Sequence, residues 1–289
     1  MDEPILHSTT KLQLEKFLSR PSHAVIISGP EGIGKHTISI WLGKQLLGLQ
    51  DSIENYPYIS IVQPDGQSIS IQAMRDLANF TKLKIPKSKR SISRLVIIEQ
   101  AQLLTTEAQN ALLKLLEEPP EGTVLILTAP NDQSLLSTIR SRAQKIHLQM
   151  PSSNQLASFF ESKDYEASKI NQALLMSGGL PGLMQALLGQ SDEHPLIKAS
   201  QTARLILKSD AFTRQCLIDS LAKQRVELGR LLFMIKQMAH AAIAQNAVRG
   251  SDASIIRWQK IQTAAYTAET ELTVNAQPKL VLSNFMLQI

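Results

Sequence analysis

Two short, wholly apolar runs, residues 95–98 and 124–127, stand on either side of a helical pattern. Runs of this length and composition are typical of parallel strands that are buried on both faces of a sheet. Between the runs, apolar residues follow the i, i+3, i+4, i+7, i+8 spacing of one helix face. These residues are Ala108, Ala111, Leu112, Leu115 and Leu116. The pattern predicts strand, helix, strand, with the right-handed crossover that parallel strands of one sheet require.

Both ends of this helix carry sequence signals. Thr106 and Gln109 have the spacing of a capping box, so we expect the helix to begin there. Pro119 and Pro120 follow the last apolar position, and a proline ring cannot continue the helical ladder. The helix should therefore end just before them.

Helical and strand patterns also follow one another near the beginning of the chain. Residues 9–20 read as an amphipathic helix, with Leu12, Leu14, Phe17 and Leu18 on its inner side. The apolar run 24–28 then reads as a strand that leads directly into GPEGIGKHT, residues 29–37, and into a helix from the lysine onward. Strand, glycine-rich loop and helix form the context that a phosphate-binding P-loop requires.

The glycine-rich loop has the chemistry of a phosphate cradle. Gly29, Gly32 and Gly34 allow backbone N–H groups to face inward, and Lys35 supplies a positive charge. The amino end of the following helix adds its dipole. We therefore expect a phosphate-binding geometry at this loop.

Position 36 departs from the P-loop pattern. The pattern places a serine or threonine directly after the lysine as a magnesium ligand, whereas this chain has His36 there and Thr37 one place later. One residue along a helix rotates a side chain by about 100°, so Thr37 should point elsewhere. Two interpretations stay open: a loop retained for packing, and a loop that binds nucleotide.

Length and composition limit the class of protein. A chain of 289 residues with 43% hydrophobic residues favours two or three globular domains. The 30 basic and 25 acidic side chains give a net charge of +5, which permits nucleic-acid contact without requiring it. Cys216 is the single cysteine, so a zinc site of four thiolates is impossible. No signal peptide and no apolar run of about 18 residues is present, so a soluble, cytoplasmic protein without membrane contact is expected.

The strand signals cease near Pro151, and helical patterns continue to the end of the chain. We expect three domains: an α/β domain at 1–150, a small helical lid at 151–192 and a helical domain at 193–289. One face of a long helix gathers Leu228, Leu231, Leu232, Ile235, Ala239 and Ala242. The final segment holds Leu280, Val281, Leu282, Phe285, Met286 and Leu287, too densely for a free tail.

The central stretch also carries a family resemblance. QNALLKLLEEPP, followed after a strand by LLSTIRSRAQKI, resembles the nucleotide-binding module of AAA+ clamp-loader subunits, and most of all the delta prime family of bacterial DNA polymerase III. The resemblance extends from HAVIISGPEGIGK to VNAQPKLVLSNFMLQI. It implies a P-loop AAA+ domain, a lid and a collar. It also implies a hetero-pentameric ring with gamma/tau-type and delta-type subunits, which places a sliding clamp on primed DNA.

Two further departures from this family pattern concern hydrolysis. Glu99 and Gln100 align with two acids, of which the first helps to hold a metal and the second orients the attacking water. A glutamine cannot accept the proton that a carboxylate accepts. Where hydrolysing members carry a lid arginine, this chain has Pro181 and Gly182. We therefore expect no ATP hydrolysis by the chain itself and no required cofactor, with ATP or ADP binding left open at a degenerate site. The residues of that site are Gly29, Gly32, Gly34, Lys35, Thr37 and Glu99.

Arg142 matches the family's most specific remaining motif. It lies in Ser141-Arg142-Ala143, similar to the Ser-Arg-Cys motif that presents an arginine finger to the nucleotide of a neighbouring subunit. The resemblance thus implies a structural stator that lends Arg142 in trans. The plain alternative is an arginine that only solvates a strand end. Two other functions stay open: a gamma/tau-type ATPase, opposed by His36 and Gln100, and a stand-alone nucleotide- or DNA-binding module.

One basic run stands out. It comprises Lys82, Lys84, Lys87, Lys89, Arg90 and Arg94. Phosphate contacts need charge more than geometry, so this run either touches a DNA backbone or forms a solvated loop.

Overall fold

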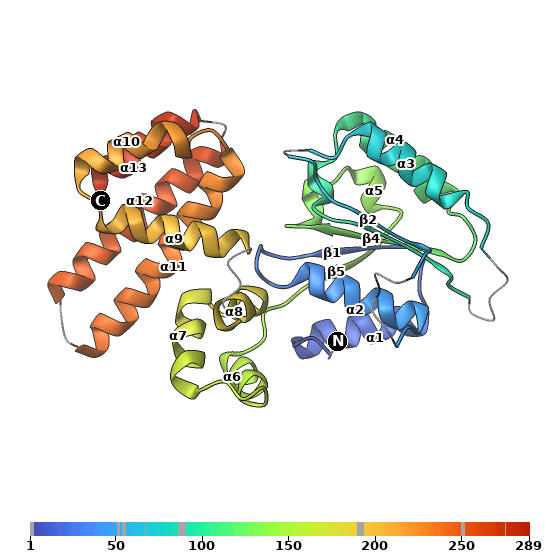
Figure 1. Ribbon diagram of the computed structural model, residues 1–289, viewed down its shortest axis with the longest axis horizontal. Coiled ribbons are helices and arrows are strands. Elements are labelled where there is room, and N and C mark those ends of the chain that lie inside the picture. Colours follow the sequence, from blue (N-terminus) through green and yellow to red (C-terminus); the bar gives the residue numbers. More distant parts are fainter. Residues whose placement is uncertain are drawn as a thin grey trace. The chain divides into compact units, whose positions relative to one another are not determined.

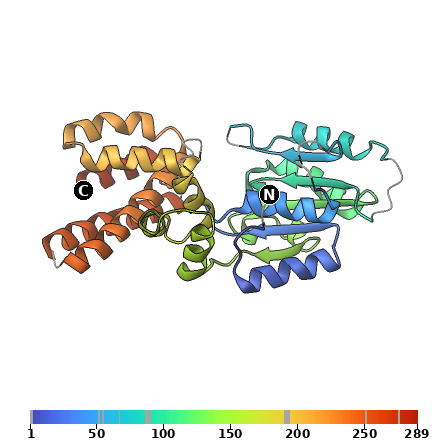
Figure 2. The ribbon, with the colours of Figure 1, turned by 60° about the horizontal axis from the view of Figure 1, so that its bottom comes forward.

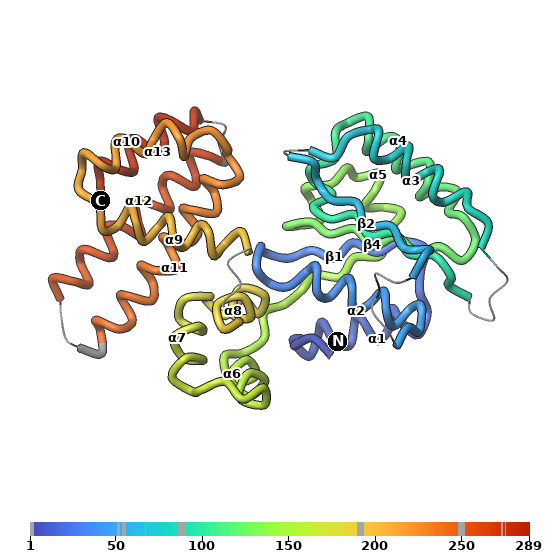
Figure 3. The backbone as a smooth tube through the Cα atoms, viewed as in Figure 1, coloured from blue at the N-terminus to red at the C-terminus, as the bar shows by residue number. Residues whose placement is uncertain are grey.

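The computed structural model shows two compact units, Met1–Ser152 and Ser153–Ile289 (Figures 1 and 3). It describes residues 3–50, 53, 56–66, 68–85, 91–189, 194–249, 252–274 and 276–289. The division falls between Ser152 and Ser153. The three domains expected from the sequence, with boundaries at residues 150 and 192, stay a prediction.

The first unit is built on a five-stranded parallel sheet with the strand order β2-β3-β4-β1-β5 (Figure 1). The strands are β1 (Ala24–Ser28), β2 (Ile59–Val62), β3 (Arg94–Ile98), β4 (Thr123–Ala129) and β5 (Gln144–His147). All residues of β1, β3 and β4 are buried, as the apolar runs predict. The predicted strand, helix, strand unit is confirmed, because β3 and β4 are parallel neighbours joined through α4.

Helices cover both faces of this sheet. They are α1 (Ser8–Ser19), α2 (Lys35–Leu47), α3 (Ile71–Thr81), α4 (Thr106–Glu117) and the short α5 (Ser137–Arg140). Alternate strand residues such as Ile26, Val96 and Leu125 join a core with α3, α4 and α5, while α1 and α2 pack on the other face (Figure 1). There α2 lies so close to β3 that a Cβ on Gly43 would stand 2.3 Å from Leu95 Cδ2. The sheet is thus fixed between two helical layers.

The first helix departs in one position from its expected inner face. Leu14 and Phe17 are fully buried and Leu18 is half-buried, but Leu12 is 66% exposed, so its predicted burial is wrong. Two residues along a helix correspond to a rotation of about 200°, so Leu12 and Leu14 lie on opposite sides of α1.

The start of α4 also differs by one residue. The cap is Thr105, whose Oγ1 accepts a hydrogen bond from the Ala108 N–H at 3.2 Å. The capping box predicted at Thr106 and Gln109 is therefore wrong. Thr106 is the first helical residue, and Gln109 Nε2 donates instead to the carbonyl oxygen of Leu104 at 3.1 Å. The other end is as predicted, since α4 ends at Glu117, before the two prolines.

In the second unit, the described residues form helices only. They are α6 (Ser153–Glu161), α7 (Ala167–Ser177), α8 (Pro181–Leu188), α9 (Pro195–Lys208), α10 (Ala211–Leu221), α11 (Arg225–Arg249), α12 (Asp252–Thr273) and α13 (Pro278–Gln288). The long helices α11 and α12 lie side by side, and α9 packs against α11 (Figures 1 and 2). None of the helices in the described parts of the chain is both long and apolar enough to span a membrane.

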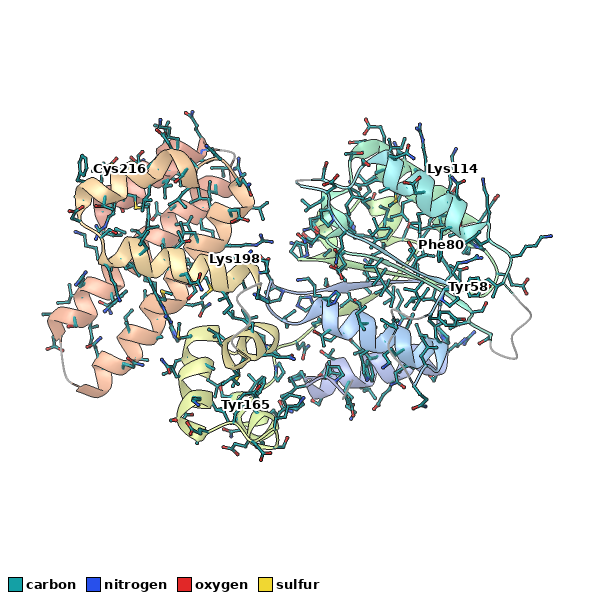
Figure 4. The ribbon with its side chains drawn as sticks, viewed as in Figure 1. Tyr58, Phe80, Lys114, Tyr165, Lys198 and Cys216 are labelled. Atoms are coloured by element: carbon teal, nitrogen blue, oxygen red, sulfur yellow. The ribbon has the colours of Figure 1, made fainter. Side chains whose placement is uncertain are left out.

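The apolar face predicted on α11 is the buried one. Leu228, Leu231, Leu232, Ile235 and Ala239 are at most 2% exposed, and Ala242 is half-buried. The dense terminal segment forms α13, which buries Val281, Leu282, Phe285 and Met286 but leaves Leu280 and Leu287 exposed. The lone Cys216 is exposed on α10 (Figure 4).

Candidate functional site

The P-loop and the strand end at Glu99 lie on the same edge of the sheet. Strands β1, β4 and β3 are parallel neighbours, so their carboxyl ends point the same way. The loop of residues 29–34 follows β1, and Glu99 follows β3. Ligands of open α/β sheets bind outside such carboxyl ends. The sheet therefore brings together the two halves of the site that the sequence predicts.

The loop has the backbone of a phosphate cradle, with one exception. Gly32 and Gly34 have φ values of 84° and 96°, which residues with a Cβ rarely adopt. The Gly29 N–H, however, donates to the carbonyl oxygen of Ala129 at 3.2 Å. The N–H of Gly29 is thus used by the sheet edge, and a phosphate would be met by other N–H groups of the loop.

Lys35 folds back onto its own loop. Its Nζ donates to the carbonyl oxygens of Gly29 at 2.7 Å and Pro30 at 2.9 Å. Burial lowers the pKa of the Lys35 ammonium to about 8, and the nearby Glu31 carboxylate opposes that shift. The lysine thus stays a cation at neutral pH, held beside the cradle.

His36 and Glu99 form an ion pair across the site. His36 Nδ1 is hydrogen-bonded to Glu99 Oε1, and Gln63 Nε2 donates to Glu99 Oε2 at 3.2 Å. The hydrogen bond to Glu99 raises the pKa of His36, burial opposes that rise, and the carboxylate charge adds to it. Both oxygens of Glu99 are therefore engaged by side chains of the protein.

This arrangement does not fit a magnesium ion. Magnesium requires oxygen ligands in a near-octahedral shell, and the carboxylate expected to help hold it is already paired with His36 and Gln63. Thr37 is half-buried and makes no hydrogen bond to Glu99 among the described residues. In the same part of the chain, no group of three or more His, Cys, Asp or Glu side chains could hold a metal ion. What the site offers is a cradle for an anion, with the His36 imidazole bound to the carboxylate that was expected to help hold a metal.

Gln100 is fixed by a contact that sequence reasoning missed. It adopts a left-handed backbone with φ 51°, and its N–H donates to Thr128 Oγ1 at 3.0 Å. Gln63 was missed as well. The order of the strands could have found both, because β2 and β4 flank β3, Gln63 directly follows β2, and Thr128 is the residue before the last in β4. In the second unit, α8 begins at Pro181, as predicted, with Gly182 beside it.

Arg142 is held by three hydrogen bonds. It follows α5, and its Nη1 donates to the carbonyl oxygen of Thr138 at 3.0 Å and to Ser141 Oγ at 3.3 Å. Its Nη2 donates to Glu117 Oε1, at the end of α4, at 2.8 Å. The side chain of Arg142 is 36% exposed. The guanidinium is therefore ordered by the chain and still open to solvent.

Arg142 lies at the sheet edge opposite its own P-loop. It precedes β5, which is parallel to β1, whereas the P-loop follows β1. A four-residue strand such as β5 alone spans roughly 13 Å. Glu117, the last residue of α4, lies at the same amino edge, because it is hydrogen-bonded to Arg142 and the chain runs on from it into the amino end of β4. Arg142 and the P-loop of this chain are thus not parts of one site.

Arg94 does not belong to the basic run as a surface charge. It is 3% exposed, with hydrogen bonds to the Leu83 carbonyl oxygen and, at 3.4 Å, to Thr123 Oγ1. Its Cζ lies 5.8 Å from the ring centroid of Phe80, whose position is shown in Figure 4. Burial lowers the pKa of Arg94. Arg94 therefore fits neither interpretation of the basic run, a DNA contact or a solvated loop. Lys82 and Lys84 are exposed, and residues 86–90 (with Lys87, Lys89 and Arg90) lie outside the described part of the chain.

Comparison with known families assigns the first unit. Residues 7–152 match the model of a family described as "DNA polymerase III, delta subunit". The chain belongs to this family. The delta prime subunit of Bacillus subtilis is 35% identical to this chain over 147 residues. The alignment covers 45% of this chain and 43% of that subunit. The delta prime subunit of Pseudomonas aeruginosa is 27% identical over 206 residues, 65% of this chain and 62% of that subunit. The aligned part thus covers about two fifths to three fifths of the length of these relatives.

A solved structure extends the likeness to the second unit. The DNA polymerase III gamma subunit-related protein of Thermotoga maritima superposes with a TM-score of 0.52, covering 96% of this chain and 97% of that chain at 18% identity. At this identity the likeness shows the fold alone. The predicted class, an α/β parallel-sheet domain followed by helices, is confirmed.

Proposed function

We propose that this chain is a delta-prime-type stator of a bacterial clamp loader in the cytoplasm. It holds a fixed place in a hetero-pentameric ring with gamma/tau-type ATPases and a delta-type subunit. In that ring it lends Arg142 to the ATP site of a neighbouring subunit. The assembly then opens a sliding clamp and places it on primed DNA.

The observation that carries this proposal is the place of Arg142. Its guanidinium is ordered by Thr138, Ser141 and Glu117 at the amino edge of the sheet, while the P-loop lies at the carboxyl edge. An arginine that stabilises a transferring phosphoryl group must touch it. An ordered, partly exposed arginine that cannot serve its own site therefore supports service to another chain's site.

The chain's own P-loop supports the same role. The carboxylate of Glu99 is hydrogen-bonded to His36, and the amide of Gln100 cannot act as a general base toward a water molecule. These residues speak against the gamma/tau-type alternative, in which the chain would hydrolyse ATP itself. They leave the first unit as a scaffold that presents Arg142.

Replacing Arg142 with alanine tests the proposal. In a complex reconstituted with its partner subunits, sliding clamp and primed DNA, Arg142→Ala should lower steady-state ATP turnover. An arginine finger is worth on the order of 10³ to 10⁵ in rate at the site it serves, but the loss should be partial because other sites keep their own arginines. The isolated wild-type chain should show no turnover above buffer.

Two variants serve as controls. Lys145→Ala removes a nearby exposed cation, paired only loosely with Asp132 at 3.4 Å, and should leave turnover unchanged. Arg142→Lys should be impaired, because an ammonium lacks the planar fork of donors. Undiminished turnover in an intact complex that contains Arg142→Ala would refute the arginine's role in trans.

A further inference from the structure

We infer that Glu117 is the positioning residue for Arg142: its carboxylate holds the guanidinium in the orientation in which it meets the neighbouring nucleotide. The inference rests on the proposed function of Arg142 in trans. It assigns a role to the last residue of α4, which lies 25 positions away from Arg142 in the sequence.

The three partners of Arg142 do different things. Thr138 and Ser141 belong to the same turn as Arg142, so they fix its side chain only relative to α5. Glu117 comes from another element and meets the far end of the guanidinium through Nη2. It is therefore the contact that fixes the tip of Arg142 relative to the body of the domain.

Both elements that make this brace are anchored in one core. Leu116, next to Glu117, is 2% exposed, and Ile139 of α5 is fully buried in the same cluster. The two prolines after Glu118 end α4 at this point, so Glu117 lies on its last turn. The carboxylate and the guanidinium thus meet between two rigid supports, as a precise functional contact requires.

The contact leaves donors for a phosphate. A guanidinium carries five N–H donors, and three of them are used by Thr138, Ser141 and Glu117. Nε–H and one Nη2–H have no acceptor within the described part of the chain. Arg142 can therefore bind a phosphate oxygen while it stays hydrogen-bonded to Glu117. The carboxylate orients the guanidinium without blocking it.

The pair is too exposed to be a device for stability. Side-chain exposure is 36% for Arg142 and 51% for Glu117, and exposed ion pairs contribute little to folding. The pair's effect on the orientation of Arg142 is larger, because a small misplacement of a catalytic group lowers the reaction rate steeply. The expected effect of losing Glu117 is thus on turnover and not on folding.

The experiment uses the reconstituted complex with clamp and primed DNA. Glu117→Ala should lower the maximal ATP turnover by part of the loss that Arg142→Ala causes. The KM for ATP, the mass of the complex and the melting temperature of the isolated chain should stay unchanged. Glu117→Gln should keep most of the rate, because its amide oxygen can accept the same hydrogen bond. Glu118→Ala, which removes the exposed neighbouring carboxylate, is the matched control and should behave as wild type.

A double-mutant cycle isolates the pair. In the Arg142→Ala background, Glu117→Ala should have no additional effect, because its only target is gone. A higher turnover with Glu117→Ala would show that the carboxylate restrains the arginine, and an unchanged turnover would show that it does nothing; either result overturns the inference. If Arg142→Ala lowers turnover and Glu117→Ala does not, the proposed function stands alone. If neither does, both fall.

Discussion

His36 stands where the P-loop pattern has a hydroxyl, and its imidazole takes the oxygen of Glu99 that a metal shell would use. The two residues are 63 positions apart, so no local pattern reveals the contact. At the scale of a residue, one side chain pairs with the carboxylate that was expected to help hold a metal. The charge of His36 depends on pH, so the contribution of the pair to stability can be measured.

The stability of the chain should fall as pH rises through the titration of His36. The hydrogen bond to Glu99 raises its pKa in the folded state above the ordinary 6.5. The imidazolium's contribution is therefore complete below about pH 6.5 and is lost above the raised value. We expect less than about 1 kcal/mol, since the imidazole side chain is 58% exposed. Urea unfolding at about pH 6 and about pH 7.5 measures the change, because Lys35, whose pKa is about 8, stays mostly protonated in that range.

Two variants test whether this pair causes the dependence. Both His36→Ser and Glu99→Gln should flatten it, because each removes one partner. A slope that survives in both variants would place its origin elsewhere in the chain.

At the scale of an element, the beginning of α4 is defined by one hydroxyl. Thr105 and Thr106 are both able to cap a helix, but only Thr105 accepts from a backbone N–H there. Losing an N-cap threonine costs about 1 kcal/mol. Thr105→Ala should therefore lower the free energy of unfolding by about that amount, measured by urea denaturation followed by circular dichroism.

Thr106→Ala is the matched comparison. It changes the first helical residue, where alanine is well tolerated, so its effect should stay within about 0.5 kcal/mol. If Thr106→Ala were the more damaging of the two, the cap assigned to Thr105 would be wrong.

The elements that the sequence predicts well are those defined by local patterns. The apolar runs of β1, β3 and β4 and the proline stop of α4 need no distant partner. Arg94 shows the opposite case: it reads as a surface charge, but the carbonyl oxygen of Leu83 and the hydroxyl of Thr123 meet it only after the chain has folded. The same holds for Glu117, because its position in QNALLKLLEEPP does not reveal that Arg142 is its partner.

At the scale of the whole molecule, the family model and the solved structure match different lengths of the chain. The match ends at residue 152, where the first unit also ends, while the likeness to the Thermotoga structure spans both units. Each unit has its own buried residues, such as Ile26 in the first and Phe285 in the second. Units of this kind are expected to fold separately.

We therefore expect the fragments 1–152 and 153–289 to unfold cooperatively on their own, as measured by calorimetry. A fragment that begins at residue 209 should melt lower or fail to fold. It lacks α9, whose buried Leu196, Ala203 and Ile206 pack in the helical unit. Equal melting of the two C-terminal fragments would contradict the place given to α9.

The ion pair of His36 with Glu99 also constrains how such a chain can change over generations. Reverting His36 to serine would free the carboxylate but leave Gln100 without basicity. Reverting Gln100 to an acid would add a carboxylate beside a metal position that is still taken. If the chain has the non-hydrolysing role proposed for it, neither single step would restore hydrolysis, so neither would give selection anything to favour. Two simultaneous changes would be required, and this epistasis would keep the subunit in that role.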